Sequence, residues 1–337
     1  MEIASLIPRI PQAQWQRELA QAIRDPLVLV QQLNLTPAQT SLAAAQQFRL
    51  VVPQSYLARI RPSDWYDPLL RQVLPLSEEL NVVDGYAHDP VGDQYASVAD
   101  GVLHKYQGRV LLVTTGACAI HCRYCFRRHF PYQAANPLKD EWSSALTYIR
   151  EHTDVQEVIL SGGDPLTLSD ERLAYLFKAL NTIPHVKRIR LHTRLPVVLP
   201  SRIDDSFLAL IQQQAQQMVM VLHVNHAQEL AASDVTQALQ ALKATKLTLL
   251  NQSVLLRGVN DSAQTLIELS NALFAQGVLP YYLHVLDQVA GAAHFHVPDT
   301  EAIALIQQVR HALPGFLVPK LVRETAGEAS KTPLEMA

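Results

Sequence analysis

The sequence predicts an α/β fold built around a partly closed parallel barrel, and three observations point to it. From residue 109 onward, short apolar runs rich in Val, Ile and Leu recur along the chain. Amphipathic helical stretches lie between successive runs, and the spacing settles to about 30 residues, which is the size of one βα unit. Six such runs occur, so we predict a partial (βα)6 barrel.

Each apolar run is predicted to form a buried parallel strand, because continuous apolar residues are typical of strands covered on both faces. The runs are RVLLVTT at 109–115, QEVILSG at 156–162, VKRIRLHT at 186–193, QMVMVLHV at 217–224, LTLLNQSVLL at 247–256 and LPYYLHVL at 279–286. Helical patterns between and after them include ERLAYLFKALNTI at 171–183, DSFLALIQQQAQQ at 205–217 and AIALIQQVRHAL at 302–313.

The region before the barrel is polar and predicted to be helical. Leu19, Ile23 and Leu27 recur at helical spacing within 15–33, which predicts one helix there. A second helix is expected over 37–48, with Thr36 as its N-cap and Pro37 at its first position.

The stretch 84–100 is polar and is expected to form a loop. We therefore divide the chain into a helical N-terminal region, a barrel core and a C-terminal segment. Their expected boundaries are 1–104, 105–313 and 314–337.

Composition excludes several classes of protein. The chain has 337 residues with 28 Lys+Arg and 31 Asp+Glu, a net charge of −3, and no long basic run. Binding to duplex nucleic acid or to an anionic membrane is therefore disfavoured. The N-terminus lacks the pattern of a secretory signal and no stretch of about 18 apolar residues occurs, so a cytoplasmic protein is expected.

All three cysteines fall within one short segment, directly after the first predicted strand. Cys118, Cys122 and Cys125 have the spacing C-x3-C-x2-C, which is the opposite of a disulfide framework. Three thiolates can hold three irons of a [4Fe-4S] cluster and leave the fourth iron open. Two alternatives remain at this point: incidental thiols, or a zinc site completed by His121 or His129.

A pair of glycines ends the second predicted strand, in LSGGDPL at 160–166. Glycine is scarce in this chain, with 12 among 337 residues, so a pair calls for a physical reason. We interpret Gly162 and Gly163 as a place where the backbone closely approaches a ligand.

The cysteine spacing together with LSGGDPL resembles the radical S-adenosylmethionine (SAM) superfamily. The resemblance implies that the open iron binds SAM and that reduction of the cluster cleaves SAM to a 5′-deoxyadenosyl radical. It also implies that the glycine-rich segment holds the SAM amino group, which nominates Ser161, Gly162, Gly163 and Asp164 as cofactor-binding residues.

Two further segments resemble the lysine 2,3-aminomutase family within that superfamily. RETAGEASKTP is similar to the segment that carries the lysine of pyridoxal phosphate (PLP), which implies that Lys331 is the catalytic, PLP-binding lysine. HKYQGRVLLVT is similar to the family segment HRYPxRVL that contacts the PLP phosphate, which nominates Lys105, Tyr106 and Arg109. Lys105 departs from the arginine usual there, so charge is retained without bidentate geometry.

The same resemblance implies the rest of the site. RLHTRLPVVLP, HVNHAQEL and NQSVLLRGVND match strand ends around SAM and PLP, which nominates His192, Arg194, His223 and Gln252. Arg127 matches the arginine that binds the substrate carboxylate. Asp287 and Glu324 match the two acids that bind the distal ammonium of lysine, with Glu324 standing where the family has aspartate.

WQRELAQAIRDP, FRRHFPY and GEASKTPL together look most like the bacterial branch that makes (R)-β-lysine for elongation factor P. The resemblance implies L-lysine as substrate, SAM regenerated in each turnover, an electron donor, and a functional link to elongation factor P and its lysine ligase. A homo-oligomer is left open. The alternatives are a glutamate 2,3-aminomutase, a radical SAM enzyme without PLP, and a non-catalytic binding module for elongation factor P.

Overall fold

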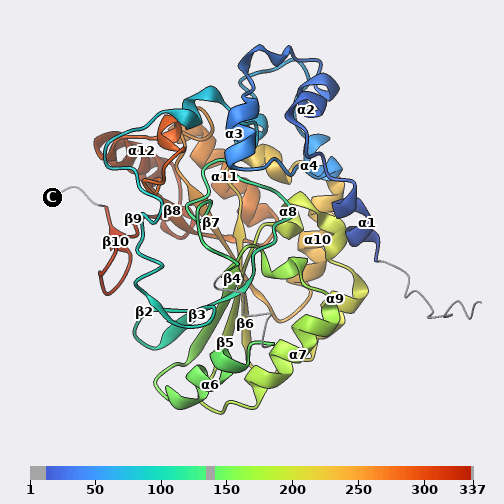
Figure 1. Ribbon diagram of the computed structural model, residues 1–337, viewed down its shortest axis with the longest axis vertical. Coiled ribbons are helices and arrows are strands. Elements are labelled where there is room, and N and C mark those ends of the chain that lie inside the picture. Colours follow the sequence, from blue (N-terminus) through green and yellow to red (C-terminus); the bar gives the residue numbers. More distant parts are fainter. Residues whose placement is uncertain (1–12, 134–140, 335–337) are drawn as a thin grey trace, which may run out of the picture.

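The computed structural model describes residues 13–133 and 141–334. Its centre is a ten-stranded sheet in the order β1 to β10, in which β3 to β9 run parallel (Figure 1). The six predicted runs are all strands, which confirms that prediction. The strands are β3 (Arg109–Thr115), β4 (Glu157–Gly162), β5 (Arg188–Thr193), β6 (Gln217–His223), β7 (Thr248–Val254) and β8 (Leu279–His284).

Strands outside those six runs complete the sheet. β1 (Ser97–Ala99) and β2 (Val102–Tyr106) precede the barrel, and β2 pairs antiparallel with β3. A further parallel strand, β9 (Lys320–Arg323), follows β8 and pairs antiparallel with β10 (Thr332–Pro333). In the described residues the sheet order is linear, so β3 and β9 do not pair and the barrel is only partly closed. The predicted fold class is confirmed.

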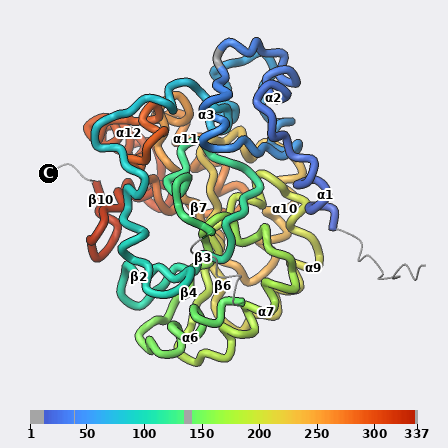
Figure 2. Tube along the Cα trace, viewed as in Figure 1, coloured from blue at the N-terminus to red at the C-terminus, as the bar shows by residue number. Residues whose placement is uncertain are grey.

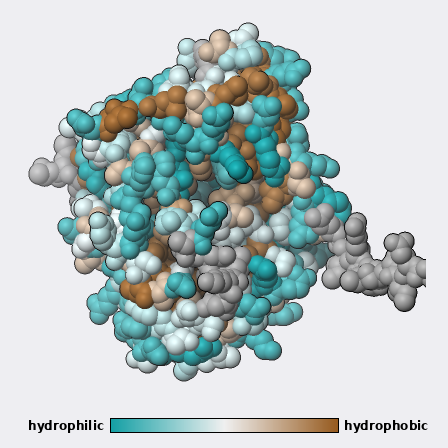
Figure 3. All heavy atoms as spheres, in the orientation of Figure 1, coloured by the Kyte–Doolittle hydropathy of each residue, from teal (hydrophilic) through white to brown (hydrophobic). Residues whose placement is uncertain are grey.

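The major helices pack on the outside of the barrel (Figures 1 and 2). Their inward faces carry buried apolar residues, such as Leu173, Leu176 and Leu180 of α7 at helical spacing. The helices are α6 (Ser143–Glu151), α7 (Asp170–Asn181), α9 (Asp205–Gln212), α10 (Ser233–Lys243), α11 (Ala263–Ala275) and α12 (Asp299–Ala312). Hydrophilic side chains cover much of the face in Figure 3, and apolar ones gather towards its upper part. No helix among the described residues is long and apolar enough to cross a membrane.

The single helix predicted over 15–33 is wrong, because two helices occupy that segment. α1 (Gln14–Ala20) ends before α2 (Pro26–Gln32) begins. Pro26 disfavours helical backbone at the residue before it, and the Asp25 carboxylate caps α2 by accepting from the Leu27 amide at 2.8 Å. Ile23 instead pairs with Val52 in a β-bridge.

The second N-terminal helix also starts later than predicted. A short 3-10 turn, Pro37–Gln39, follows Thr36, whose side chain caps nothing. The helix α3 (Leu42–Gln47) begins after Ser41, whose Oγ accepts from the Ala44 amide at 3.2 Å. Ser41 is therefore the N-cap.

The N-terminal region packs beside the segment that follows β5. The short helices α4 (Gln54–Leu57) and α5 (Pro68–Arg71) belong to it, and α8 (Leu195–Val198) lies on the barrel side. Ser55 donates to the Val198 carbonyl at 2.7 Å, and Arg59 donates to the Val197 carbonyl at 2.6 Å. Because α8 follows a strand's carboxyl end, these contacts hold the N-terminal region against the end of the barrel where α/β sites form.

Candidate functional site

One cavity of about 990 Å³ lies inside the partial barrel. Every residue nominated from the sequence lines it, although those residues come from distant parts of the chain. They are Lys105, Tyr106, Arg109, Cys118, Cys122, Cys125, Arg127, Ser161, Gly162, Gly163, Asp164, His192, Arg194, His223, Gln252, Asp287, Glu324 and Lys331. The fold thus brings together the cysteine loop, the strand ends and the C-terminal lysine.

The cysteine loop follows β3, and the side chains of Cys118, Cys122 and Cys125 all line the cavity. Burial raises the pKa of the Cys125 thiol to about 11. In the described residues, no three His, Cys, Asp or Glu side chains converge as ligands of one metal ion would. In an iron–sulfur cluster each thiolate binds its own iron, so three cysteines on one loop are a donor set that suits such a cluster.

A fully buried carboxylate ties this loop to the N-terminal region. Glu79 lies on the 3-10 turn Ser77–Leu80, and its Oε1 and Oε2 accept from Arg123 Nε and Nη2 at 2.8 and 2.6 Å. Arg128 Nη2 donates to the same Oε2 at 2.8 Å. Since Arg123 and Arg128 flank Cys125, one carboxylate holds both sides of the loop.

Arg194 fixes the loop from the other direction. Its Nη1 lies 2.8 Å from Cys122 Sγ, and its Nη2 donates to Glu229 Oε2 and to Gln72 Oε1, each at 2.7 Å. The resemblance placed Arg194 near SAM; in the structure its guanidinium contacts a cysteine and a buried glutamate. These contacts connect the Cys122 side chain to the buried Glu229 and Gln72.

The paired glycines also meet a packing requirement within the protein. A Cβ at Gly163 would lie 2.2 Å from the Ala117 carbonyl oxygen. Gly162 has a φ of +110°, and a Cβ at this position would lie 2.9 Å from the Thr115 carbonyl oxygen. The backbone that approaches these glycines is the start of the cysteine loop. Glycine here lets β4 and that loop lie in contact, which sets the loop's position relative to the strand end.

Asp164 is engaged by the protein itself. Its carboxylate accepts from Thr193 Oγ1 and from the Arg194 amide, each at 2.7 Å, and from the Leu166 amide at 3.0 Å. Burial raises its pKa to about 6. The side chain thus connects the ends of β4 and β5.

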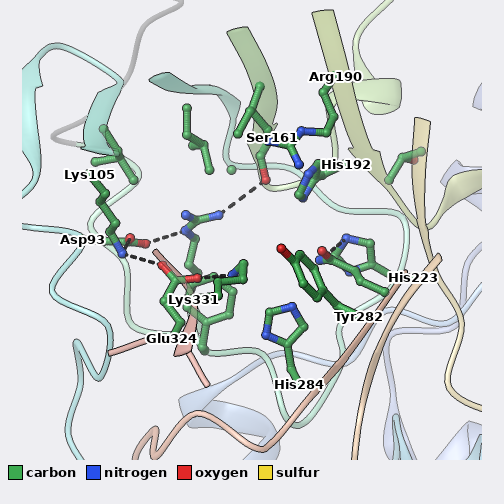
Figure 4. A pocket seen from close by; sticks show the side chains of 18 of the residues that line it. Asp93, Lys105, Ser161, Arg190, His192, His223, Tyr282, His284, Glu324 and Lys331 are labelled. Carbon is green, nitrogen blue, oxygen red and sulfur yellow. Dashed lines mark hydrogen bonds and ion pairs between the residues drawn. The ribbon is translucent and has the colours of Figure 1, made fainter. Parts of the chain in front are cut away.

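A chain of alternating charges runs across the cavity to Lys331 (Figure 4). Arg127 Nε pairs with Asp93 Oδ2 at 2.6 Å, and Lys105 Nζ pairs with Asp93 Oδ1 at 2.6 Å. Lys105 also lies 2.9 Å from Glu324 Oε1, and Glu324 Oε2 pairs with Lys331 Nζ. The nearby cations hold the pKa values of Asp93 and Glu324 below their ordinary range.

Three histidines from different strands face the same space. His192 and His223 pack edge to face with ring centroids 5.9 Å apart, and His223 Nε2 lies 2.9 Å from Gln252 Nε2. Nε2 of His192 and Nε2 of His284 are buried without a hydrogen-bond partner among the described residues. Burial lowers the pKa of all three, to about 3 for His223. They are therefore neutral, and Nε2 of His192 and Nε2 of His284 are available to a ligand.

Asp287 is a carboxylate without a partner. No side-chain hydrogen bond or ion pair joins it to another described residue, and burial together with the charge of Glu324 raises its pKa to about 7. A half-buried acid that lines a cavity and has no side-chain partner is suited to receive a cation.

Tyr106 and Arg109 lie next to each other in the lining of the cavity. The Arg109 guanidinium lies 4.5 Å from the centre of the Tyr106 ring, a stacked cation–π contact. With Lys105 they provide two cations and a hydroxyl, which is a donor set that suits a phosphate.

The sequence did not identify several residues that organise the site. Asp93 lies in the stretch expected to be a loop, where nothing marks it as buried. His284 and Tyr282 lie within a strand predicted only for its apolar character, yet both line the cavity. The arginines around the cysteines were a signal that a buried acid such as Glu79 must exist to pair with them.

The fold and site define a radical SAM protein: a partial parallel barrel with three cysteines in the loop after its first strand. The family model described as the Radical SAM superfamily matches residues 112–269, which supports a [4Fe-4S] cluster and SAM as cofactors. The chain is 47% identical over 325 residues to the L-lysine 2,3-aminomutase of Escherichia coli strain K12, covering 96% of this chain and 94% of that protein.

A second relative, the L-lysine 2,3-aminomutase of Haemophilus influenzae, is 47% identical over 94% of both chains. The enzyme of that name from Clostridium subterminale is 37% identical over 86% of this chain and 69% of its own. The chain belongs to the radical SAM L-lysine 2,3-aminomutase family of isomerases.

Proposed function

We propose that the protein converts L-α-lysine to (R)-β-lysine by radical migration of the amino group. The observation that carries this proposal is that the cysteine loop and Lys331 line one cavity, which Arg127 and Asp287 also line. The relatives named L-lysine 2,3-aminomutase support the same reaction.

The residues present suit the cofactors that this reaction needs. Cys118, Cys122 and Cys125 would hold the cluster, and SAM would bind beside Ser161–Gly163, where Nε2 of His192 is also unpartnered. Lys331 would attach PLP, with its phosphate held by Lys105, Tyr106 and Arg109. When bound, the cluster and SAM supply a radical that removes a hydrogen atom, and PLP supplies the carbonyl that carries the amino group.

The substrate would lie between two charged ends of the site. Arg127 would bind its carboxylate, with Asp93 holding the guanidinium through Nε and Ser161 Oγ lying 3.4 Å from Nη1. Asp287 would bind its distal ammonium. The three neutral imidazoles line the space between without adding charge, and the buried walls keep water from the radical.

Glutamate would fit this cavity less well than lysine. Its distal carboxylate would face Asp287 and Glu324, and like charges in a buried site repel. A non-catalytic role would leave unexplained why the cysteines, a C-terminal lysine and unpartnered imidazoles line one cavity.

The biological setting is part of the proposal. We infer that the β-lysine product serves to modify a lysine on elongation factor P, which is supported by the similarity of FRRHFPY and GEASKTPL to that branch. An external electron donor would reduce the cluster. We propose the cytoplasm as its location, because the three cysteines are free thiols.

The test is an anaerobic assay with iron, sulfide, PLP, SAM, a reductant and L-lysine, followed by chromatography of the product. We expect β-lysine from the wild-type protein and none from Cys122→Ala or Lys331→Ala. SAM cleavage without β-lysine would refute the substrate assignment. Absence of both from protein verified to hold its cluster would favour the binding module.

A further inference from the structure

Arg194 lies between the cysteine loop and a buried polar network that reaches the N-terminal region. Its side chain is 6% exposed, and that of its ion-pair partner Glu229 is 0% exposed. Arg194 Nη2 donates to Glu229 and to Gln72, whereas Nη1 lies 2.8 Å from Cys122 Sγ. The two ends of one guanidinium group therefore serve different partners, a cysteine on one side and two buried side chains on the other.

The protein fixes Arg194 at its backbone and at its guanidinium. The backbone amide donates to Asp164 Oδ2 at 2.7 Å, which anchors the residue at the end of β5. Glu229 Oε1 accepts from the Asn225 amide at 2.9 Å, and Asn225 Nδ2 donates to Gln72 Oε1 at 3.0 Å. Because the acceptors of Nη2 are themselves held in place, the planar guanidinium presents Nη1 to the sulfur in one direction.

Arg194 has a further donor that the protein leaves unused. Its Nε is buried without a hydrogen-bond partner in the part of the chain that the structure describes. The side chain lines the cavity together with the three cysteines. A buried donor without an acceptor is costly, and the sulfurs of an iron–sulfur cluster accept hydrogen bonds. The unused donor therefore suits a cluster bound in this cavity.

The surroundings of Cys122 differ from those of the other two cysteines. Within residues 13–133 and 141–334, no side chain donates a hydrogen bond to Cys118 or Cys125. The two arginines that flank Cys125 bind a buried carboxylate instead. Cys122 thus has a charged side-chain donor, which a substitution can change without altering the backbone of the loop.

We propose that Arg194 raises the reduction potential of the iron–sulfur cluster through its hydrogen bond to Cys122, and that Glu229 is the positioning residue that orients its guanidinium. Reduction takes one electron from the external electron donor and moves no proton. The added electron increases the negative charge on the sulfur ligands, which strengthens a hydrogen bond donated to them. The reduced cluster is therefore stabilised more than the oxidised cluster, and its potential rises.

This role differs from the SAM contact that the resemblance implied for Arg194. It requires the cluster but not the lysine substrate, so it goes beyond the proposed function. Glu229 balances the charge of Arg194. The effect on the cluster therefore depends on where the guanidinium points and not on a net charge.

The experiment measures the midpoint potential of the reconstituted cluster in an anaerobic redox titration, followed by the electron paramagnetic resonance signal of the reduced form. SAM is left out, so that altered SAM binding cannot change the result. Arg194→Lys keeps the charge and can still pair with Glu229, but a single ammonium cannot also reach Cys122. We expect the equilibrium constant for reduction to fall about tenfold, which lowers the potential by about 59 mV.

Glu229→Asp tests the positioning role in the same titration. It keeps the negative charge but shortens the side chain, so the guanidinium should be drawn away from Cys122 and the potential should fall. An unchanged potential in Glu229→Asp would overturn the positioning role.

Arg202→Lys is the matched control. Arg202 is also fully buried and pairs with a carboxylate, that of Asp170, at 2.7 Å. Its other partners are the backbone carbonyls of Leu166 and Leu168. The potential should stay at the wild-type value in this variant. A fall as large as that of Arg194→Lys would assign the effect to the loss of any buried arginine and would overturn the inference.

Iron analysis gives the amount of cluster that each variant holds, and the potential is that of the loaded fraction. A wild-type potential in Arg194→Lys together with weaker SAM binding would assign Arg194 to SAM and refute the proposal. If Arg194→Lys does not fold, the double variant Arg194→Met with Glu229→Gln decides in its place, because removing both members of a buried ion pair is tolerated better than removing one. An unchanged potential there refutes the proposal as well.

The titration is independent of the reaction that the loaded enzyme catalyses. A wild-type protein that makes no β-lysine, while Arg194→Lys lowers the potential of its cluster, would refute the proposed function and support the inference. Formation of β-lysine with an unaltered potential in Arg194→Lys would do the reverse.

Discussion

Two carboxylates in this molecule each form ion pairs with two cationic side chains, but the cations differ. Glu79 lies between Arg123 and Arg128 behind the cysteine loop, and Glu324 lies between Lys105 and Lys331 at the opposite part of the site. The side chains of Glu79 and Arg123 are 0% exposed, whereas those of Glu324 and Lys331 are 16% and 21% exposed.

The partners of Glu79 are arginines and those of Glu324 are lysines, and the two kinds of cation differ in what they can do chemically. Guanidinium groups stay charged and bind carboxylates through two nitrogens, so the Glu79 cluster can only hold the loop in place. A lysine ammonium is a single charge that can lose its proton and become a nucleophile. The two cations beside Glu324 are therefore of the kind that can react, whereas the two beside Glu79 are not.

The largest effect is expected from Glu79→Gln, which tests whether the arginine cluster is structural. Removing the charge leaves two buried guanidinium groups without an anion, so the free energy of unfolding should fall by about 3–5 kcal/mol. Iron bound after reconstitution should fall as well. Urea denaturation and iron analysis measure the two effects.

Glu301→Gln is the control, because Glu301 also binds an arginine, Arg257, through both oxygens but at the surface. That change should leave the free energy of unfolding nearly unchanged, because solvent screens an exposed ion pair. Equal losses in the two variants would show that burial of Glu79 does not matter.

Gly163→Ala tests the contact between β4 and the cysteine loop. The new Cβ would meet a backbone oxygen that cannot rotate away, so we expect a loss of about 3 kcal/mol in stability and a lower iron content. Gly315→Ala is matched to it, because a Cβ there meets nothing within 4 Å. A stable, fully loaded Gly163→Ala protein would contradict the proposed packing.

Asp287→Asn tests whether this acid binds the distal ammonium of the substrate. Loss of a charged partner for the distal ammonium should raise KM for lysine about 10–100-fold, since a hydrogen bond to a charged group is worth about 1.5–3 kcal/mol. Iron content should not change, because Asp287 does not contact the cysteine loop. Steady-state kinetics with iron analysis would check both statements.

The pH dependence of lysine binding follows from the raised pKa of Asp287, about 7. Below that pH the acid is mostly protonated and cannot pair with an ammonium; above it the carboxylate is available. KM for lysine should therefore fall about tenfold between pH 6 and pH 8. Asp287→Asn should lose this dependence, and an equal slope in that variant would assign it to another group.

The smallest effect on stability is expected where the hairpin of β9 and β10 meets α12. Arg323 forms two hydrogen bonds with the Asp299 carboxylate, at 2.9 and 2.6 Å, but both side chains are more than one-third exposed. Asp299→Asn should cost about 0–1 kcal/mol. Thermal denaturation measures this loss of stability. A loss as large as that of Glu79→Gln would show that the exposed Arg323–Asp299 pair stabilises the protein as much as the buried Glu79 cluster does.

Local pattern was sufficient to predict much of this protein. Runs of buried residues identified the strands from β3 to β8, because a parallel strand covered on both faces is apolar along its whole length. The local pattern did not identify β9, which has only four residues. It also wrongly predicted one helix over 15–33, where Pro26 interrupts the helix. Motif resemblance nominated Cys118, Cys122, Cys125 and Lys331, and the fold brings all four to one cavity.

The tertiary structure alone decided which charges pair. Asp93 reaches Arg127 across 34 positions in the chain, and Lys105 reaches Glu324 across 219. It also decided that Gly163 faces the cysteine loop and that Glu324 binds lysines of the protein itself. The strength of an ion pair depends on distance and burial in space, and neither quantity is encoded in the spacing of two residues along a sequence.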